Sequence, residues 1–250
     1  MIDRIYIPTL GRPNTQITYD GLPDFVKDIT YLVVQPHEKD LHGDKKVIVL
    51  PKSIKGIHKT REWIYNKAKN TIWGMYDDDL VFLNRNGSDR VVMTNEDWKY
   101  MLDKTYHFLT NGTAFAGHRL SFLHPSDNEY IDIGAIHCAY YFNGYVVPEL
   151  TWPIPLAEDL HMVLSLLEQG YNNKVWHKYA VNNKEYSEGG CNTEGLRDID
   201  KINDAHRQLV ELHPEIVKIV GKKKNKMGEI DKLRIAWKKA YKNTNLTGFI

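Results

Sequence analysis

Three consecutive aspartates between two apolar runs constrain the fold of this chain more than any other feature. Residues 72–76, IWGMY, form an apolar and aromatic run typical of a buried strand, and residues 80–83 form a second one. Adjacent carboxylates repel one another and are costly between apolar segments unless something compensates their charge. A divalent cation is the simplest compensation, because Mg²⁺ and Mn²⁺ prefer oxygen ligands. Ligands usually bind at the carboxyl ends of strands, so the triplet predicts a metal site for a phosphate-bearing substrate. An acidic turn between two strands is the alternative.

The spacing within the triplet separates the expected roles of its members. In an extended segment Asp77 and Asp79 point to the same side, so they are the predicted metal ligands, while Asp78 points elsewhere, for example to a sugar hydroxyl. A cation held there would neutralise the charge that develops on a departing nucleotide diphosphate. His177, in a segment that alternates like an edge strand, is a candidate third ligand, because Mn²⁺ accepts neutral imidazole. A structural role is the alternative for His177, and His137 competes for the same function.

Short apolar runs interleaved with helical patterns predict an α/β fold. The runs at residues 5–7, 31–34 and 47–50 each end close to a proline, and a helix predicted over residues 59–69 leads into the aspartate strand. This order predicts a mostly parallel, Rossmann-like sheet flanked by helices. At 250 residues, the chain is long enough for one large domain with a substantial core.

The last thirty residues are basic, although the net charge of the whole chain is only +1. We expect a hinge at residues 221–228 and a last helix, so that residues 221–250 form a basic helical tail. Cations mixed with aromatic residues favour a DNA-facing element, because phosphate contacts dominate nucleic-acid affinity. The candidate DNA-binding residues are Lys222, Lys223, Lys224, Lys226, Arg234, Lys238 and Lys239. Plain solvated surface and attachment to a membrane surface are the alternatives.

A short turn with one cation follows the first predicted strand. It spans Thr9–Pro13, the position where α/β proteins usually hold a nucleotide, and its Arg12 is suited to pair with phosphate. Gly56 permits close approach of a backbone, and Arg61, in the first turn of a helix, would point back towards the same cleft. Both arginines are equally explained as surface residues when they are considered alone.

The acidic pair Glu158–Asp159 begins a second strong helix pattern. The helix dipole favours negative charge there, which explains such a pair without any catalytic role. A base that accepts a proton from an acceptor hydroxyl also suits a rigid helix start at a cleft edge. Downstream, glycines among small polar residues in 187–197 predict a mobile loop that folds over a bound diphosphate, with a surface connection as the alternative.

The cysteines and the hydropathy pattern indicate the compartment. Cys138 and Cys191 are the only cysteines, which makes neither a disulfide framework nor a zinc pattern. The chain begins with no stretch of signal-peptide kind and has no run of about twenty apolar residues. We therefore expect a cytosolic, reduced protein without a transmembrane segment.

Taken in order, these features resemble a GT-A glycosyltransferase over roughly residues 1–200. The first strand with its TLGR turn is similar to that family's nucleotide-sugar half, Asp77–Asp79 to its DxD metal motif, and Ala157–Asp159 to its acceptor-side xED motif. The segments IYIPTLGRPNTQ, GIHKTREWI and SEGGCNTEGLRD are more narrowly similar to TET/JBP-associated bacteriophage glycosyltransferases. Those enzymes glycosylate hydroxymethylated pyrimidines in DNA.

The resemblance implies a GT-A domain over residues 1–220, with a nucleotide-sugar half at 1–94 and an acceptor half at 95–220. It implies transfer from a UDP-sugar, with Mn²⁺ or Mg²⁺, to the hydroxymethyl group of 5-hydroxymethylcytosine or 5-hydroxymethyluracil in double-stranded DNA, in the host cytoplasm if the protein is phage-encoded. To reach the cleft, the modified pyrimidine would have to flip out of the duplex, or the DNA groove would have to widen. Glu158 or Asp159 would deprotonate the acceptor, giving inversion at the sugar, with a retaining mechanism still open. The implied metal ligands are Asp77 and Asp79, and the implied donor-binding residues are Pro8, Thr9, Gly11, Arg12, His58, Arg61, Asp77, Asp78, Gly189 and Gly190.

Three other functions compete with this interpretation. A GT-A transferase with a glycan or lipid-linked acceptor would share the donor half. A nucleotidyltransferase would need a long Gly-rich first loop with a lysine, whereas Thr9–Pro13 is short and lacks one. A DNA-binding protein with structural aspartates would be much more basic than this chain.

Overall fold

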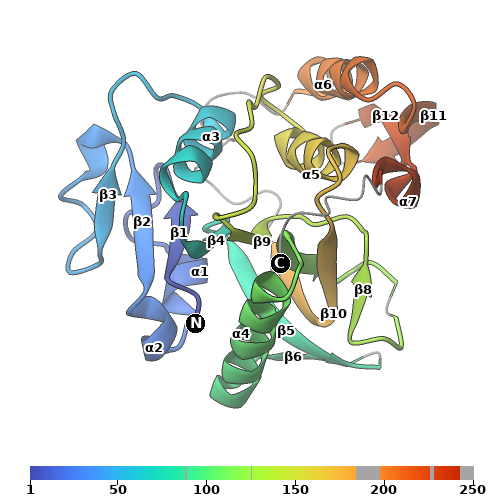
Figure 1. The fold of residues 1–250 in the computed structure, drawn as a ribbon. Helices are drawn as coiled ribbons and strands as arrows, with labels where there is room; N and C mark the ends of the chain where they lie inside the picture. Colours follow the sequence, from blue (N-terminus) through green and yellow to red (C-terminus); the bar gives the residue numbers. More distant parts are fainter. Residues whose placement is uncertain (88, 125, 184–197, 226–227, 243–250) are drawn as a thin grey trace.

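The computed structural model describes residues 1–87, 89–124, 126–183, 198–225 and 228–242 as one α/β unit (Figure 1). Its centre is a ten-stranded sheet in the order β3-β2-β1-β4-β9-β7-β10-β5-β6, with β8 paired to β10. The strands are β1 (Arg4–Pro8), β2 (Thr30–Val34), β3 (Val47–Val49), β4 (Ile72–Tyr76), β5 (Leu80–Asn86), β6 (Asp89–Val92), β7 (Phe115–Leu120), β8 (Tyr130–Asp132), β9 (Ala139–Asn143) and β10 (Asn173–Asn183). The helices are α1 (Ile17–Asp20), α2 (Asp24–Lys27), the 3₁₀ helix η1 (Pro36–Glu38), α3 (Ile57–Lys67), α4 (Asn95–Thr110), α5 (Glu158–Glu168), α6 (Ile199–Leu212) and α7 (Trp237–Ala240).

The predicted α/β sheet is confirmed, with its first half parallel. β3, β2, β1 and β4 run parallel to one another, and β9 then runs antiparallel to both β4 and β7. β7 and β10 are parallel, while β5 and β6 form an antiparallel hairpin at the far edge. All strands parallel to β1 therefore end at one edge of the sheet, and this edge carries Pro8, Asp77, Leu120 and Asn183. The sheet is mixed because β9 and β5 return the chain from that edge.

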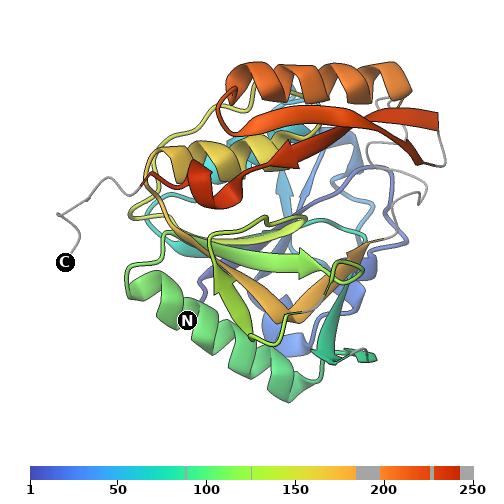
Figure 2. The same ribbon diagram turned by 90° about the vertical axis from the view of Figure 1, so that its right-hand side faces the viewer.

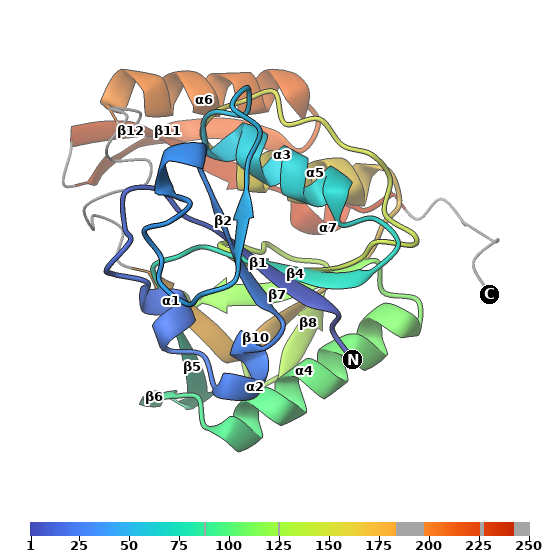
Figure 3. The same cartoon turned by 90° about the vertical axis from the view of Figure 1, so that its left-hand side faces the viewer.

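Two apolar layers cover the two faces of the sheet. On one face Trp73, Phe115 and Phe142 pack against residues of α3 and α5. On the other face, Phe82 and Tyr141 pack against α4 through buried side chains such as Trp98. Figures 1 and 3 show α3, α5 and α6 on one side of the sheet and α4 on the other. Burial on both faces explains the near-continuous apolar run of β4, all of whose residues are buried.

The predicted helical tail is wrong for the described part of the C-terminus. Residues after 216 form an antiparallel hairpin of β11 (Val217–Asn225) and β12 (Gly228–Ile235), followed by the single turn of α7. β-branched residues in IVKIV favour the strand, and α6 supplies the packing surface, with the Asp231 amide donating to Asn203 Oδ1 at 2.7 Å. Figure 2 shows α6 and the hairpin lying together above α5. The expected domain boundary at residue 220 falls inside β11, whereas the division into donor and acceptor halves stays a prediction.

A close backbone approach at Gly117 positions the segment before β9. A Cβ atom at this position of β7 would lie 2.2 Å from Ile136 Cγ2 and 2.5 Å from the Ala139 carbonyl oxygen. Only glycine therefore lets residues 136–138 lie directly on β7. The Asp77 amide donates to the Cys138 carbonyl at 2.8 Å, so the same segment is tied to the aspartate turn.

We predict that Gly117→Ala destabilises the protein by about 2 kcal/mol and lowers its activity, because overpacking moves residues 136–138. Urea denaturation measures the change in the free energy of unfolding. Gly134→Ala is the matched control, since its Cβ would meet only side-chain carbons at 3.2 Å or more. Equal stability of the two variants would contradict this role for Gly117.

Candidate active site

A cleft of about 660 Å³ lies along the edge where the parallel strands end. One wall comes from the ends of β1, β2 and β3 and from the start of α3, and it includes Pro8, Thr9, Val33, Gln35, Leu50, Gly56, Ile57 and Thr60. The floor is Asp77–Asp79, and the opposite wall carries His137, Cys138, Glu158 and Asp159. Side chains of α6 and the β11–β12 hairpin close one side, namely Ile202, Ala205, His206, Lys223, Lys224 and Ile230.

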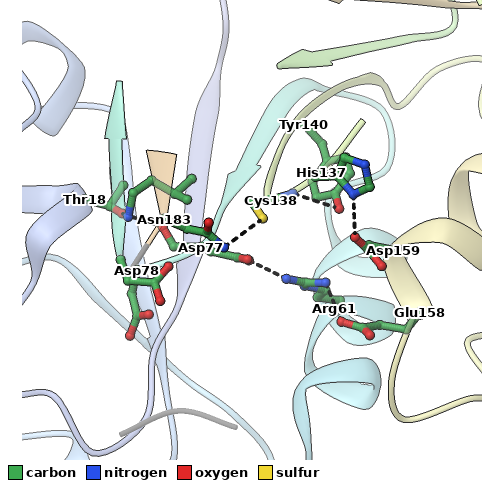
Figure 4. A network of polar contacts seen from close by, with 12 residues as sticks. Thr18, Arg61, Asp77, Asp78, His137, Cys138, Tyr140, Glu158, Asp159 and Asn183 are labelled. Atoms are coloured by element: carbon green, nitrogen blue, oxygen red, sulfur yellow. Dashed lines mark hydrogen bonds and ion pairs between the residues drawn. The ribbon is translucent and has the colours of Figure 1, made fainter. Parts of the chain in front are cut away.

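Arg61 joins the floor of the cleft to the wall at α5 (Figure 4). Its Nη2 donates to Asp77 Oδ1, and its Nη1 lies 2.5 Å from Glu158 Oε1. Burial lowers the pKa of Arg61, but the two carboxylates raise it well above its ordinary value. The side chain is only 5% exposed, so this bridge operates where water screens charge poorly.

The aspartate triplet is a turn and not an extended segment. Residues 78 and 79 form the turn between β4 and β5, so the expected alternation of side chains is wrong. Asp78 is buried, accepts from Thr9 Oγ1 at 2.6 Å and pairs with Arg12, whose Nη1 also lies 3.6 Å from Asp79 Oδ2. Burial raises the pKa of Asp78 to about 6, against the lowering by Arg12 and Thr9. Asp78 therefore ties the first loop to the cleft floor.

Thr18 of α1 stabilises the aspartate turn by hydrogen bonds to its backbone. Its amide donates to the Asp78 carbonyl at 3.1 Å, and its hydroxyl donates to the Asp77 carbonyl at 2.5 Å. The same hydroxyl accepts from the Leu80 amide at 2.7 Å. These backbone contacts place all three carboxylates without using the carboxylates themselves.

The acidic pair at the start of α5 is divided into two environments. Glu158 is 6% exposed and faces Arg61, and burial raises its pKa above the ordinary value although Arg61 lowers it. Asp159 lies beside His137, with Oδ2 3.2 Å from the ring Nδ1 (Figure 4). Burial raises the pKa of Asp159, but hydrogen bonding from His137 and the charge of Arg61 lower it below its ordinary value. Asp159 is thus an ionised, positioned carboxylate in the cleft wall.

The fold brings some of the predicted donor-binding residues together in the cleft, but not all of them. Pro8, Thr9, Arg12, Arg61, Asp77 and Asp78 line the cleft. Gly11 lies in an adjoining hollow with Asp79, and its amide donates to Glu38 Oε1 at 2.6 Å. His58 is in the first turn of α3 but is not among the residues that line the cleft. Gly189 and Gly190, with the whole loop 187–197, lie outside the described residues.

Several cleft residues were missed by the sequence analysis. Gln35 and Leu50 follow β2 and β3, and the parallel order of these strands with β1 was the signal that could have found them. Asn183 comes to the cleft from the end of β10, and only the tertiary fold brings it there. Cys138, at φ 65°, lines the cleft beside Asp77, and burial raises the pKa of its thiol well above the ordinary value.

The C-terminal cations are spread over several surfaces. Lys223 and Lys224 line the cleft, whereas Lys222 and Arg234 are exposed on the hairpin. Lys238 and Lys239 are exposed on α7, and Lys239 Nζ lies 3.4 Å from Glu215 Oε2. Lys226 lies outside the described residues. A DNA-binding role for these lysines and for Arg234 therefore stays a prediction.

His177 does not lie with the aspartates, so the prediction of a third metal ligand is wrong. Asn183 reaches the cleft at the end of β10 and pairs with Leu80, while Tyr179 already pairs with Asn84 further along β5. His177 lies beyond Tyr179, away from the cleft, because β10 runs antiparallel to β5. Within the described residues, no group of three histidine, cysteine or carboxylate side chains is arranged to hold a metal ion.

The carboxylates nevertheless suit a metal that arrives with a substrate. Mg²⁺ commonly takes one or two protein carboxylates and completes its shell with water and substrate phosphates. Asp77 and Asp79 are two such hard oxygen donors on the cleft floor. The residues present therefore fit a shared site, not one formed by the protein alone.

Comparison with known proteins identifies the family. The family model described as TET-Associated Glycosyltransferase matches residues 4–190. This chain belongs to that family. It is a glycosyltransferase, and the DxD-like turn, Arg61 and the acidic pair of the cleft all lie inside the matched range.

Two curated relatives come from bacteriophages. A Beta-glucosyl-HMC-alpha-glucosyl-transferase of Enterobacteria phage T6 is 26% identical over 232 residues, which are 84% of this chain and 80% of the relative. The enzyme of the same name from Enterobacteria phage T2 is 27% identical over 208 residues, 74% of this chain and 72% of the relative.

A solved structure supports the fold. Residues 1–349 of S. aureus TarS, in complex with UDP-GlcNAc, superpose with a TM-score of 0.50 at 13% sequence identity, over 86% of this chain and 67% of TarS. At that identity the likeness concerns the α/β glycosyltransferase fold alone. No described helix of this glycosyltransferase is long and apolar enough to cross a bilayer.

We predict that Mn²⁺ alone changes the melting temperature little, whereas Mn²⁺ with UDP raises it by several degrees, because the diphosphate completes the metal shell. Differential scanning fluorimetry measures both. Asp79→Asn should abolish the extra shift, and His177→Gln should keep it. A large shift with Mn²⁺ alone, lost in His177→Gln, would restore His177 as a ligand.

Proposed function

We propose that this glycosyltransferase moves a sugar from a UDP-sugar to a hydroxymethylated pyrimidine in DNA. The names of the phage T6 and T2 relatives support an HMC-containing acceptor, and the UDP-GlcNAc complex of TarS, at the same fold, supports a uridine donor. The nucleotide lies along the wall at Pro8, Val33 and Ile57, and the sugar extends over the aspartate turn towards α5. The acceptor hydroxyl approaches the sugar at the wall that carries Glu158 and Asp159.

Asp159 carries the mechanistic part of the proposal. It is ionised, lies in the cleft wall and is positioned by His137, so it can accept the proton of an acceptor hydroxyl. Glu158 is committed to Arg61, and through Arg61 it positions Asp77. Asp159 is therefore the base and Glu158 is a positioning residue.

Leaving-group stabilisation comes from the cleft floor. The departing diphosphate gains negative charge, and the guanidinium groups of Arg12 and Arg61 stabilise it. Asp77 and Asp79 would hold Mg²⁺ or Mn²⁺ together with the diphosphate, and the bound cation supplies further neutralisation of that charge. Lys223 and Lys224 add positive charge from the opposite side of the cleft.

The relatives' names favour a second acceptor within the same class. They describe transfer to HMC that already carries a β-linked glucose. The nucleophile would then be a sugar hydroxyl instead of the hydroxymethyl group. Direct displacement assisted by Asp159 inverts the anomeric configuration, whereas an α-linked product from an α-linked donor retains it, so the linkage of the product tests the assigned role.

We predict that purified protein with Mn²⁺ and UDP-glucose glycosylates duplex DNA that contains either 5-hydroxymethylcytosine or its β-glucosylated form. Mass spectrometry of digested nucleosides measures the product, and NMR gives its anomeric linkage. Asp159→Asn should lower kcat at least about a hundredfold with an unchanged Kd for UDP, as expected for loss of a general base. Glu158→Gln should weaken UDP binding instead.

The matched comparison is between these two neighbours. Full turnover by Asp159→Asn, with loss of turnover in Glu158→Gln, would reverse the roles. Absence of product from both modified DNAs, with product on a glycan or lipid-linked acceptor, would overturn the DNA acceptor while leaving the donor site intact.

We further predict that His137→Asn shifts the acid limb of kcat to higher pH. His137 lowers the pKa of Asp159, so the wild-type base stays ionised as the pH falls, and removal of the histidine makes it protonate earlier. The profile is measured with both substrates saturating, so that protonation of Asp78, with its pKa of about 6, affects binding less. An unshifted limb would contradict the role of His137.

A further inference from the structure

Three basic side chains gather on neighbouring strands outside the catalytic cleft. Arg119 lies on β7, His177 on β10 and Arg85 on β5, and these strands are adjacent in the order β7-β10-β5. The mechanism proposed above uses none of them. His177 is the residue that the sequence analysis assigned to a metal.

A bulge in β10 places His177 between the two arginines. The register with β7 shifts between Trp176 and Ala180, and Ala180 pairs with Arg119. The amides of His177 and Lys178 both donate to the Glu129 carbonyl at 2.9 Å. Bulges redirect side chains, and here the redirected imidazole lies close enough to both guanidinium groups for their charges to affect it.

The polar atoms of this cluster are buried without hydrogen-bond partners. His177 is 5% exposed and Arg85 8% exposed. Both ring nitrogens of His177, Nη1 of Arg85 and Nε of Arg119 are buried and make no hydrogen bond. Arg85 does use Nη2, which donates to the Leu123 carbonyl at 2.9 Å. A buried polar group without a partner costs free energy, so a ligand is the expected explanation.

The charge of the cluster specifies the sign of that ligand. Arg90 of β6 pairs directly with Arg85, and like charges in that position repel. In the described parts of the chain, none of Arg85, Arg90 and Arg119 forms an ion pair with a carboxylate. Burial, together with the positive charges of Arg119 and Arg85, lowers the pKa of His177 to about 4. A metal cation would be repelled here, and an anion would be attracted.

We propose that Arg85, Arg119 and His177 bind a phosphate group of the acceptor's phosphodiester backbone, an inference that rests on the proposed function. Arg119 lies one residue before Leu120 of the cleft, whereas His177 and Arg85 lie further along β10 and β5. A phosphate bound by this cluster therefore belongs to the backbone that flanks the reacting nucleotide, and not to that nucleotide itself. Guanidinium groups suit phosphate oxygens, and the imidazole adds a donor. Phosphate contacts of this kind position a duplex without reading its sequence.

An exposed aromatic residue beside the cluster favours nucleic acid over free phosphate. Phe122 is 53% exposed and precedes Leu123, whose carbonyl accepts from Arg85. Aromatic side chains next to cations stack on unpaired bases, and a base that leaves the helix exposes neighbours for such stacking. Inorganic phosphate carries the same kind of charge as a phosphodiester, but it has no base that could stack on Phe122.

The first test needs neither the donor reaction nor DNA. Melting temperatures are measured against inorganic phosphate concentration, with UDP and Mn²⁺ present so that the donor cleft is filled. Phosphate should raise the melting temperature of the wild type and of Arg4→Gln, a control that removes an exposed cation at the opposite end of β1. Arg119→Gln and Arg85→Gln should lose this rise. Without phosphate, Arg119→Gln should melt no lower than the wild type, because an unpaired charge is removed.

The second test uses modified duplex DNA and UDP-glucose. Arg119→Gln should raise KM for DNA about tenfold and reduce the slope of log KM against log salt by about one, leaving KM for UDP-glucose unchanged. Equal stabilisation of wild type and Arg119→Gln by phosphate would overturn the anion site. If Arg119→Gln loses the stabilisation by phosphate but keeps its KM for DNA, the cluster binds an anion that does not belong to the DNA backbone. If no DNA is glycosylated by any form, the proposed function fails, and the phosphate titration still decides the site. Arg119→Gln carries both tests if Arg85→Gln does not fold.

Discussion

The buried bridge from Asp77 through Arg61 to Glu158 is the interaction on which the rest of the site depends. It joins the end of β4, the second turn of α3 and the start of α5, which come from separate parts of the sequence. Loss of the arginine would leave the buried Glu158 and the partly buried Asp77 without this counterion, and loss of either carboxylate would leave the arginine partly uncompensated. The bridge therefore sets the distance between the cleft floor and the wall at α5. Asp159 takes its place in the cleft from the same helix start.

The chain compensates its acidic floor with its own arginines. Three adjacent aspartates suggested a cation, and Arg12 and Arg61 supply positive charge to all three carboxylates in the folded protein. In the proposed mechanism the donor diphosphate brings negative charge to the same place, so the same two arginines would also stabilise the bound donor. In the proposed mechanism Asp77 and Asp79 would hold a metal ion only together with the substrate, because two protein carboxylates do not complete the shell of Mg²⁺.

A nearly neutral net charge conceals a strong separation of charge within the fold. Carboxylates occupy the cleft floor and the start of α5, whereas Arg85, Arg90 and Arg119 gather where β5, β6 and β7 approach the bulge of β10. The basic C-terminal segment is also divided, with Lys223 and Lys224 directed to the cleft and other lysines to the outer surface. A single number for net charge therefore says little about where a polyanion can bind.

The sequence by itself determined the parallel strands before residue 80, the acidic triplet at the end of β4 and the helix that begins at Glu158. Each of these follows from local information: apolar runs that end in turn residues, and charges at the ends of elements.

The tertiary structure decided which charged side chains contact one another. Glu158 and Asp159 are neighbouring carboxylates, and only their contacts with Arg61 and His137 give them different environments. His177 follows the same alternation as a ligand-bearing strand residue would, but β10 runs antiparallel to β5 and carries it away from the aspartates and towards two arginines. The C-terminal segment has helical spacing, yet it pairs as a hairpin because α6 offers it a surface on which to pack. The periodicity of a sequence indicates which residues are buried. Which residues contact one another across the fold depends on the order and direction of the strands, and no local sequence pattern specifies these.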